Sequence, residues 1–177
     1  MSPKHLLLTG YRGCGKSVVG QLLSQLLSRT LVDVDIAIES TAGKSIAEIF
    51  AESGEVAFRD LESAQIEALG LLPEPAIISL GGGAILRSEN RRRIQTLGFT
   101  VWLQASPETV AQRIASDVFT RSRRPKLSKL GDMEEIRSIL ESRLAWYKEV
   151  ADFAVDTDNL TMQQVADTIV DRFQLIT

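Results

Sequence analysis

The chain has 177 residues, of which 44% are hydrophobic and 24% are charged. These proportions are close to the globular average, so they exclude a disordered or fibrous chain, and the length suits one sizeable core. The 20 basic and 23 acidic side chains give a net charge of -3, which is the opposite of a general nucleic-acid binder's footprint. We therefore expect residues 1–177 to form one compact domain without a nucleic-acid partner.

The apolar segments predict neither secretion nor membrane insertion. Residues 6–9 form the apolar run before Gly10, and a signal peptide needs a longer one. The stretch at 68–86 is interrupted by Pro73 and Pro75, whereas a spanning helix needs about 20 apolar residues in succession. The single cysteine excludes an intramolecular disulfide, which is typical of a reducing compartment. We expect a cytoplasmic monomer without a membrane partner.

Five short runs rich in branched and aromatic residues alternate with segments of helical periodicity. Their lack of strict polar alternation is typical of a parallel sheet covered by helices on both faces, which predicts a doubly wound α/β fold. Capping boxes at Ser45 with Glu48 and at Thr161 with Gln164, and Pro107 after an N-capping serine, indicate three helix starts. The expected strands are 5–9, 30–34, 76–80, 101–104 and 153–156.

The strongest chemical motif follows the first expected strand. Residues 10–17, GYRGCGKS, match the pattern G-x-x-x-x-G-K-[ST] and precede a helix that we expect to reach about Leu27. Glycines let backbone N–H groups curl around phosphate oxygens at the positive end of such a helix. Lys16 would add a charge at the β and γ phosphates, and Ser17 a hydroxyl ligand for Mg²⁺. A nucleoside triphosphate is the expected ligand.

Two aspartates stand at the end of the second expected strand. Asp33 and Asp35 are two residues apart, so in an extended chain both carboxylates project to the same side. One could hold a magnesium-bound water, and the other could orient an acceptor hydroxyl and take its proton during phosphoryl transfer. Surface capping explains the pair equally well.

An arginine and a glutamate stand three residues apart in the helical segment that contains Phe58. An ordinary i,i+3 ion pair between Arg59 and Glu62 is the simpler interpretation. In the functional alternative, Glu62 holds Arg59 so that its planar guanidinium can bind a carboxylate through two hydrogen bonds.

Two further segments point to a ligand. Gly81, Gly82 and Gly83 close the third expected strand, where they exceed what a turn requires and indicate a close approach of backbone to ligand. The segment at 115–132 carries five basic residues, and its length favours a functional lid, with a solvated basic loop as the alternative.

Other prominent residues are expected to be structural. His5 and Cys14 are unique in the chain, yet neither has the partner that a metal site or a nucleophile would need. The arginines at 91–93 are expected to form a solvated helix face. The large aromatic residues expected in the core are Phe99, Trp102 and Trp146.

Taken in order, these motifs resemble those of the shikimate kinase family, and the resemblance runs from Leu6 to about Val170. The family pattern joins a phosphate-binding loop, a D-x-D, an F-R-x-x-E, a glycine triplet, an R-P lid and a late R-x-x-x-Y. In this chain these stand as residues 10–17, Asp33 with Asp35, Phe58-Arg59 with Glu62, Gly81 to Gly83, Arg124-Pro125, and Arg143 with Tyr147.

The resemblance implies a three-layer P-loop fold with a five-stranded parallel sheet and a mobile lid at about 115–132. It implies catalytic roles for Asp35, Lys16 and Arg124, and a carboxylate clamp formed by Arg59 and Arg143. The implied metal residues are Ser17 and, through water, Asp33. The implied nucleotide-binding residues are Gly13, Cys14, Gly15, Lys16, Ser17, Val18, Arg113 and Arg124. The implied substrate-binding residues are Asp35, Arg59, Gly81, Gly82, Gly83 and Arg143.

The activity that the resemblance implies is transfer of the ATP γ-phosphate to the 3-hydroxyl of shikimate, in aromatic amino acid biosynthesis, with Mg²⁺ as cofactor. A related small-molecule kinase such as gluconate kinase would not be expected to combine F-R-x-x-E with the glycine triplet. A catalytically silent, shikimate-binding regulatory domain is disfavoured by the intact Lys16, Ser17 and aspartate pair. A GTPase is disfavoured because the sequence has no N-K-x-D motif.

Overall fold

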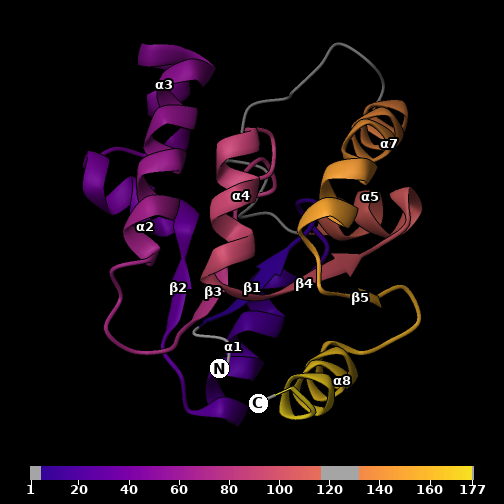
Figure 1. The fold of residues 1–177 in the computed structure, drawn as a ribbon. Helices are drawn as coiled ribbons and strands as arrows, with labels where there is room; N and C mark the ends of the chain where they lie inside the picture. Colours follow the sequence, from indigo (N-terminus) through magenta and orange to yellow (C-terminus); the bar gives the residue numbers. More distant parts are fainter. Residues whose placement is uncertain (1–4, 117–131, 177) are drawn as a thin grey trace.

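The chain forms a five-stranded parallel sheet between two layers of helices (Figure 1). The computed structural model describes residues 5–116 and 132–176. All strand pairs are parallel, in the order β2-β3-β1-β4-β5, so the predicted α/β class and sheet are confirmed. The strands are β1 (His5–Thr9), β2 (Leu31–Asp33), β3 (Ile77–Ser79), β4 (Gly98–Gln104) and β5 (Phe153–Asp156).

The helices begin where the capping signals predict. Ser45 and Glu48 form a complete capping box, as do Thr161 and Gln164. The hydroxyl of Ser106 accepts a hydrogen bond from the backbone N–H of Thr109 at 3.2 Å. The helices are α1 (Lys16–Leu27), α2 (Val34–Ala42), α3 (Ile46–Leu69, with a kink at Gly54), α4 (Ser88–Leu97), α5 (Pro107–Ser116), α7 (Asp132–Val150) and α8 (Met162–Gln174).

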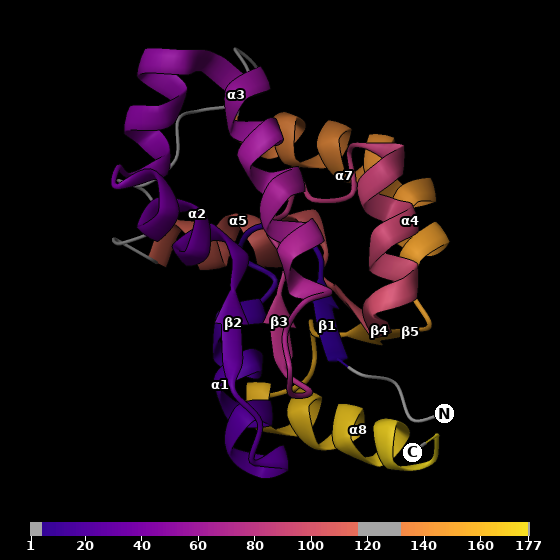
Figure 2. The same ribbon diagram turned by 60° about the vertical axis from the view of Figure 1, so that its left-hand side comes forward.

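Successive residues of β1 face different cores, because side chains alternate across a strand. Leu6 and Leu8 pack with residues of α1 and α8, whereas Leu7 packs with residues of α2, α3, α4 and α7. Figure 2 shows α1 and α8 in the lower part of the view and α3, α4 and α7 in the upper part. Both faces of the central strand are therefore buried, which explains its lack of polar alternation.

Several boundaries differ from the sequence-based expectation, among them the following three. β2 ends at Asp33, so Val34 already belongs to α2. β4 begins at Gly98 rather than at residue 101, because the strand starts directly after α4 and pairs Gly98 with His5. The expected lid at 115–132 overlaps the end of α5 and the first residue of α7; residues 117–131 lie outside the described part of the chain.

The arginines at 91–93 are not simply a solvated face, which corrects the prediction for Arg91. Its guanidinium donates to the carbonyl oxygen of Ile85 at 2.9 Å, pairs with Glu149 at 2.8 Å and lies over the ring of Trp146. Arg91 therefore fastens α4 to α7. Phe99 and Trp102 are buried as predicted, and Trp146 packs partly buried against the core cluster that contains Trp102.

No helix in residues 5–116 and 132–176 is long and apolar enough to cross a membrane.

Candidate active site

Two adjoining pockets lie where β1, β2 and β3 end, at the carboxyl edge of the sheet, the position at which doubly wound sheets bind ligands. The larger, here called the loop pocket, encloses about 1400 Å³ and is lined by the loop at 10–17 together with residues of α1, α2 and α5. The smaller, here called the inner pocket, encloses about 520 Å³ and is lined mainly by residues of α3, the glycine triplet and α7. The residues that line both are Arg12, Asp35, Ile46 and Gly82.

The loop at 10–17 has the backbone of a phosphate cradle. Gly15 caps α1 with a φ of 99°, in the left-handed region that strains a residue with a side chain. No side chain caps this helix end, so its first N–H groups can meet an anion, which the helix dipole also attracts. Lys16 donates from Nζ to the carbonyl oxygens of Gly10 and Tyr11, at 2.8 and 3.0 Å.

Most of the predicted nucleotide residues line the loop pocket: Gly13, Gly15, Lys16, Ser17, Val18 and Arg113. Arg113 is held by β5, since its guanidinium donates to the hydroxyl and the carbonyl oxygen of Thr157, at 2.9 and 2.8 Å. Cys14 differs, because its side chain is buried and does not line this pocket, although its Sγ accepts a hydrogen bond from Lys16 Nζ at 3.7 Å. Cys14 can therefore contribute only backbone groups.

The two aspartates do not lie on one extended strand, which corrects the geometry expected for them. Asp33 is the N-cap of α2 and accepts from the N–H groups of Asp35 and Ile36, at 3.0 and 3.2 Å. Asp35 lies in the first turn of this helix. Both residues nevertheless line the loop pocket, and Asp35 also lines the inner pocket. Asp33 therefore caps α2 and also lines the loop pocket, so the two interpretations are compatible.

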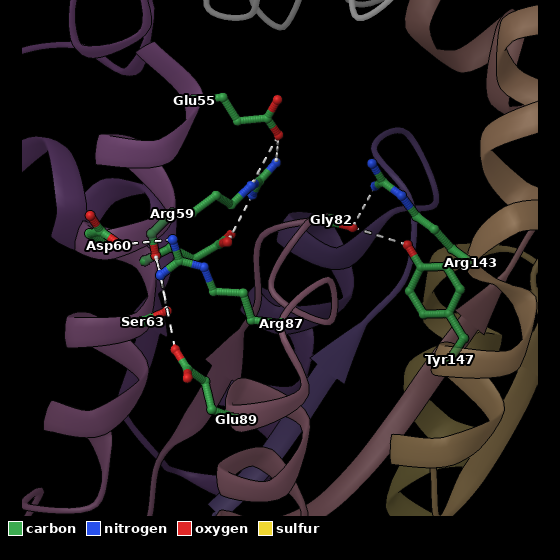
Figure 3. Close-up of polar contacts among 10 residues, drawn as sticks. Glu55, Arg59, Asp60, Ser63, Gly82, Arg87, Glu89, Arg143 and Tyr147 are labelled. Carbon is green, nitrogen blue, oxygen red and sulfur yellow. Dashed lines mark hydrogen bonds and ion pairs between the residues drawn. The ribbon is translucent and has the colours of Figure 1, made fainter. Parts of the chain in front are cut away.

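Arg59 projects from α3 into the inner pocket between two glutamates (Figure 3). Its Nη1 pairs with Glu62 Oε2 at 2.8 Å, and its Nη2 with Glu55 Oε1 at 3.1 Å. Glu62 is only 1% exposed; burial raises the pKa of its carboxyl, and Arg59 opposes that shift. The i,i+3 ion pair between Arg59 and Glu62, which the sequence analysis gave as the simpler interpretation, is therefore present. It fixes the guanidinium at the pocket wall.

The glycine triplet makes room for the charged side chains of the site. A Cβ at Gly83 would lie 2.2 Å from Arg59 Nη1, and one at Gly81 would lie 2.8 Å from Asp35 Oδ1. Gly82 and Gly83 line the inner pocket, whereas Gly81 lines neither pocket. The close approaches seen here are made by the protein's own side chains, and contact of the triplet with a ligand stays a prediction.

Arg143 and Tyr147 reach the site from α7 and meet at one atom (Figure 3). Arg143 Nη1 and the Tyr147 hydroxyl both donate to the carbonyl oxygen of Gly82, at 2.9 and 3.2 Å. Tyr147 is buried and stacks on Trp102, with ring centroids 5.3 Å apart. Burial raises the pKa of Tyr147, so its hydroxyl remains a donor. This pair holds the glycine triplet against α7.

Sequence reasoning assigned no role to several residues of the site. Arg12, Tyr11, Ile46 and Phe50 line the inner pocket, and Met162 and Glu39 line the loop pocket. One signal was available, because the capping box at Ser45 places Ile46 at the start of α3. The ring of Phe50 packs on that of Phe58 at 4.8 Å across the kinked helix, a contact that no spacing rule predicts.

Sequence reasoning also assigned no role to Arg87, which contacts the turn of α3 that bears Arg59 (Figure 3). Its guanidinium pairs with Asp60 at 2.7 Å and donates to the carbonyl oxygen of Arg59 and the hydroxyl of Ser63, both at 3.2 Å. It thereby ties the turn of α3 that bears Arg59 to the segment after the glycine triplet. The predicted catalytic Arg124 lies outside the described residues.

A parallel sheet of this order, a phosphate-binding loop at the end of β1 and an adjoining pocket lined by arginine and carboxylate groups define a P-loop phosphotransferase of small molecules.

Comparison with known proteins gives the family. The sequence profile described as shikimate kinase matches residues 12–174. The chain is 45% identical to the shikimate kinase of Rhodopirellula baltica over 96% of this chain and 90% of that one. It is 36% identical to the shikimate kinase of Symbiobacterium thermophilum over 96% of each. The chain belongs to the shikimate kinase family.

Solved structures agree with this assignment. The shikimate kinase of Acinetobacter baumannii in complex with shikimate superposes with a TM-score of 0.89 at 30% identity, covering 99% of this chain and 94% of that one. A gluconokinase of Sinorhizobium meliloti gives a TM-score of 0.61 at 17% identity, covering 98% and 94%. The second likeness shows a shared fold alone.

Proposed function

We propose that this chain transfers the γ-phosphoryl group of ATP to the 3-hydroxyl of shikimate, giving shikimate 3-phosphate and ADP. The observation that carries the proposal is the position of Asp35, which lines both pockets at their junction. Donor and acceptor must meet at such a point, since phosphoryl transfer needs the attacking and leaving oxygens in line.

The inner pocket suits a small hydroxylated carboxylic acid. Arg59 and Arg143 line it, and two arginines are suited to bind one carboxylate through paired, charge-assisted hydrogen bonds. The rings of Phe50 and Phe58 and the side chain of Ile46 supply an apolar wall for the carbon ring. The acid would lie with its carboxylate at the arginines and its hydroxyls toward Asp35.

The transfer step follows from this placement. The 3-hydroxyl oxygen forms the new bond to the γ-phosphorus while the bond from that phosphorus to the β–γ bridging oxygen breaks. Asp35 orients the hydroxyl and accepts its proton as the new bond forms. Lys16 exchanges the carbonyl oxygens of Gly10 and Tyr11 for phosphate oxygens, and the loop N–H groups hold the remaining negative charge.

The residues of the loop pocket fit Mg²⁺. Ser17 and Asp33 both line this pocket and offer hydroxyl and carboxylate oxygens, the donors that this ion prefers. No cluster of three or more candidate metal-ligating His, Cys, Asp or Glu residues occurs within 5–116 and 132–176. Ser17 would hold the ion directly and Asp33 through water. When bound, the ion offsets charge on the β and γ phosphates.

The proposal has further parts. Arg124 would contact the transferring phosphate from a lid at about 115–132, and Arg113 would flank the adenine. Residues 1–177 would act as a single domain and a cytoplasmic monomer. Water would be kept from the ATP by closure of the lid.

The test is a coupled assay of ADP release with MgATP and shikimate, with the product identified by mass spectrometry. We expect turnover that depends on shikimate, with gluconate or a nucleoside monophosphate giving little. Lys16→Ala serves as the inactive control, checked for folding by circular dichroism. Shikimate binding without turnover would support the silent regulatory domain instead, and preferential use of gluconate would support the related kinase.

A further inference from the structure

Arg12 occupies a position in the site that the family motif does not specify, since it fills a variable position of G-x-x-x-x-G-K-[ST]. It is the only residue of the loop at 10–17 that lines both pockets. It is also the only basic residue lining both within the described chain. Asp35, the proposed acceptor of the hydroxyl proton, also lines both pockets.

The other cations around the pockets already have protein partners. Arg59 pairs with Glu55 and Glu62, Arg143 donates to the Gly82 carbonyl, and Arg113 donates to Thr157. These contacts fix each of them at a wall of its pocket.

Arg12 differs from them. It makes no hydrogen bond or ion pair with any residue of the described ranges, and its closest aromatic contact places Cζ 5.8 Å from the Tyr11 ring centroid. Its Nε is buried without an acceptor among those residues. Leaving a buried donor unsatisfied costs about 1–3 kcal/mol, so such a group calls for an explanation in a native protein.

The position of Arg12 favours a phosphoryl group over the acid's carboxylate as the acceptor. Arg59 and Arg143 line only the inner pocket, where the carboxylate would be bound. The transferring phosphoryl group starts in the loop pocket and ends on the acid, so a cation at the junction stays beside it throughout. In a loose transition state the charge is spread over three peripheral oxygens, which a planar guanidinium can contact at two points.

We propose that Arg12 binds the phosphoryl group during its transfer and is therefore a catalytic residue of this chain. It remains protonated throughout and forms no covalent bond, so its contribution is electrostatic. The inference rests on the proposed function, because the identity of the transferred group and of the acceptor comes from it.

The test compares Arg12→Ala, Arg12→Gln and Arg12→Lys with the wild-type protein in the shikimate-dependent assay. Arg92→Ala, at an exposed arginine of α4, is the matched control and is expected to behave as wild type. We expect Arg12→Ala and Arg12→Gln to lower kcat by about 10²–10³-fold, the range seen when one preorganised donor to a developing charge is lost. The KM values for shikimate and ATP should change much less, by about tenfold at most, as expected for an interaction that is stronger in the transition state than in the ground state.

A second measurement separates phosphoryl binding from structural support. Calorimetric titration should show Arg12→Gln losing about tenfold in affinity for shikimate 3-phosphate while its affinity for shikimate stays close to wild type. Arg12→Lys should recover part of kcat, since it keeps the charge without the planar fork. Thermal unfolding of each variant shows whether the fold is intact.

Two results would overturn the inference. A raised KM for shikimate with unchanged kcat would make Arg12 a carboxylate ligand, and unchanged kinetics in all three variants would leave it without a role. If the wild-type protein itself shows no shikimate-dependent turnover, the proposed function fails. If the wild type turns over and Arg12→Gln matches it, only this inference fails.

Discussion

The two pockets are built in different ways. In the loop pocket, the part that suits phosphate is one continuous stretch, residues 10–17, with its backbone N–H groups and helix end, although side chains from other elements complete the lining. The inner pocket draws Asp35 from α2, Arg59 from α3, two glycines from the turn after β3, and Arg143 from α7. Of the arginines that line it, Arg59 and Arg143 are each held by a protein group.

This difference predicts how each pocket responds to substitution. A site made of backbone depends on glycine conformations and on Lys16, and it tolerates changes in most other side chains. A site made of side chains from several elements depends on every supporting contact, since a displaced partner moves the binding group. Substitutions near the inner pocket should therefore change acceptor affinity while leaving ATP affinity almost unchanged.

The largest expected effect is at the junction. Asp35→Asn should lower kcat by about 10²–10⁴-fold, the usual contribution of a positioned proton acceptor, because an amide cannot accept the hydroxyl proton. ATP affinity should be retained, since the loop is untouched. Steady-state assays and a fluorescent-nucleotide titration measure the two quantities. Asp171→Asn, an exposed aspartate of α8, is the control, and an Asp35→Asn variant as active as the parent would remove the assigned role.

The next effect isolates the inner pocket. Arg59→Ala should weaken shikimate binding by about 10- to 100-fold through loss of a charge-assisted contact, with ATP affinity unchanged. It should also destabilise the fold by about 3 kcal/mol, because Glu62 is left buried without its partner.

The double variant Arg59→Ala/Glu62→Gln separates these two consequences. Removing the buried charge should restore much of the unfolding free energy but none of the shikimate affinity. Equal losses of shikimate and ATP affinity in Arg59→Ala would instead assign Arg59 a purely structural role.

A smaller effect is expected from the glycine triplet. Gly83→Ala forces Arg59 to move, since the added Cβ would lie 2.2 Å from Nη1. We expect shikimate affinity to fall about tenfold, in keeping with the roughly 1–3 kcal/mol cost of overpacking. Gly82→Ala is the matched comparison, because its Cβ would meet nothing closer than 3.5 Å. Chemical denaturation of the unliganded proteins should show Gly83→Ala as the less stable of the two.

The smallest effect concerns the titration of Glu62. Burial raises the pKa of its carboxyl above the ordinary value of 4.5, so the folded protein holds this proton more tightly than the unfolded chain does. The resulting stabilisation is fully present below pH 4.5 and is lost as the pH rises through the folded pKa. Glu62→Gln lacks this titration, so its unfolding free energy relative to wild type should rise with pH across that window.

Urea denaturation at a series of pH values measures this trend. A pH profile of Glu62→Gln parallel to that of wild type would contradict the raised pKa.

Features that depend on residues close together in the sequence were predicted from short sequence patterns. The strands of the sheet, the capped helix starts and the loop at 10–17 each depend on neighbouring residues, and the structure confirms them. The prediction that Asp33 and Asp35 lie on one extended strand was wrong. A residue pattern does not show that the strand ends at Asp33 and that a helix begins at the next residue.

Contacts between distant segments could not be predicted from the sequence alone. The pattern around Arg91 predicts a solvated helix residue, yet Glu149 and Trp146 of α7 lie beside it. The support of Arg59 by Arg87 depends on packing of α3 against the segment after β3. Only the family resemblance gave Arg59 a role beyond an ordinary ion pair and pointed to Arg143 at all, and their assigned roles remain predictions.

The stack of Trp102 on Tyr147 gives the protein an internal optical reporter. Trp102 is one of two tryptophans, and its ring lies against the tyrosine whose hydroxyl contacts the carbonyl of Gly82. Gly82 lines both pockets, so a ligand that shifts this carbonyl also shifts the tyrosine ring against the indole. Intrinsic fluorescence, with Trp146→Phe removing the second emitter, should therefore follow occupancy of either pocket without an added label.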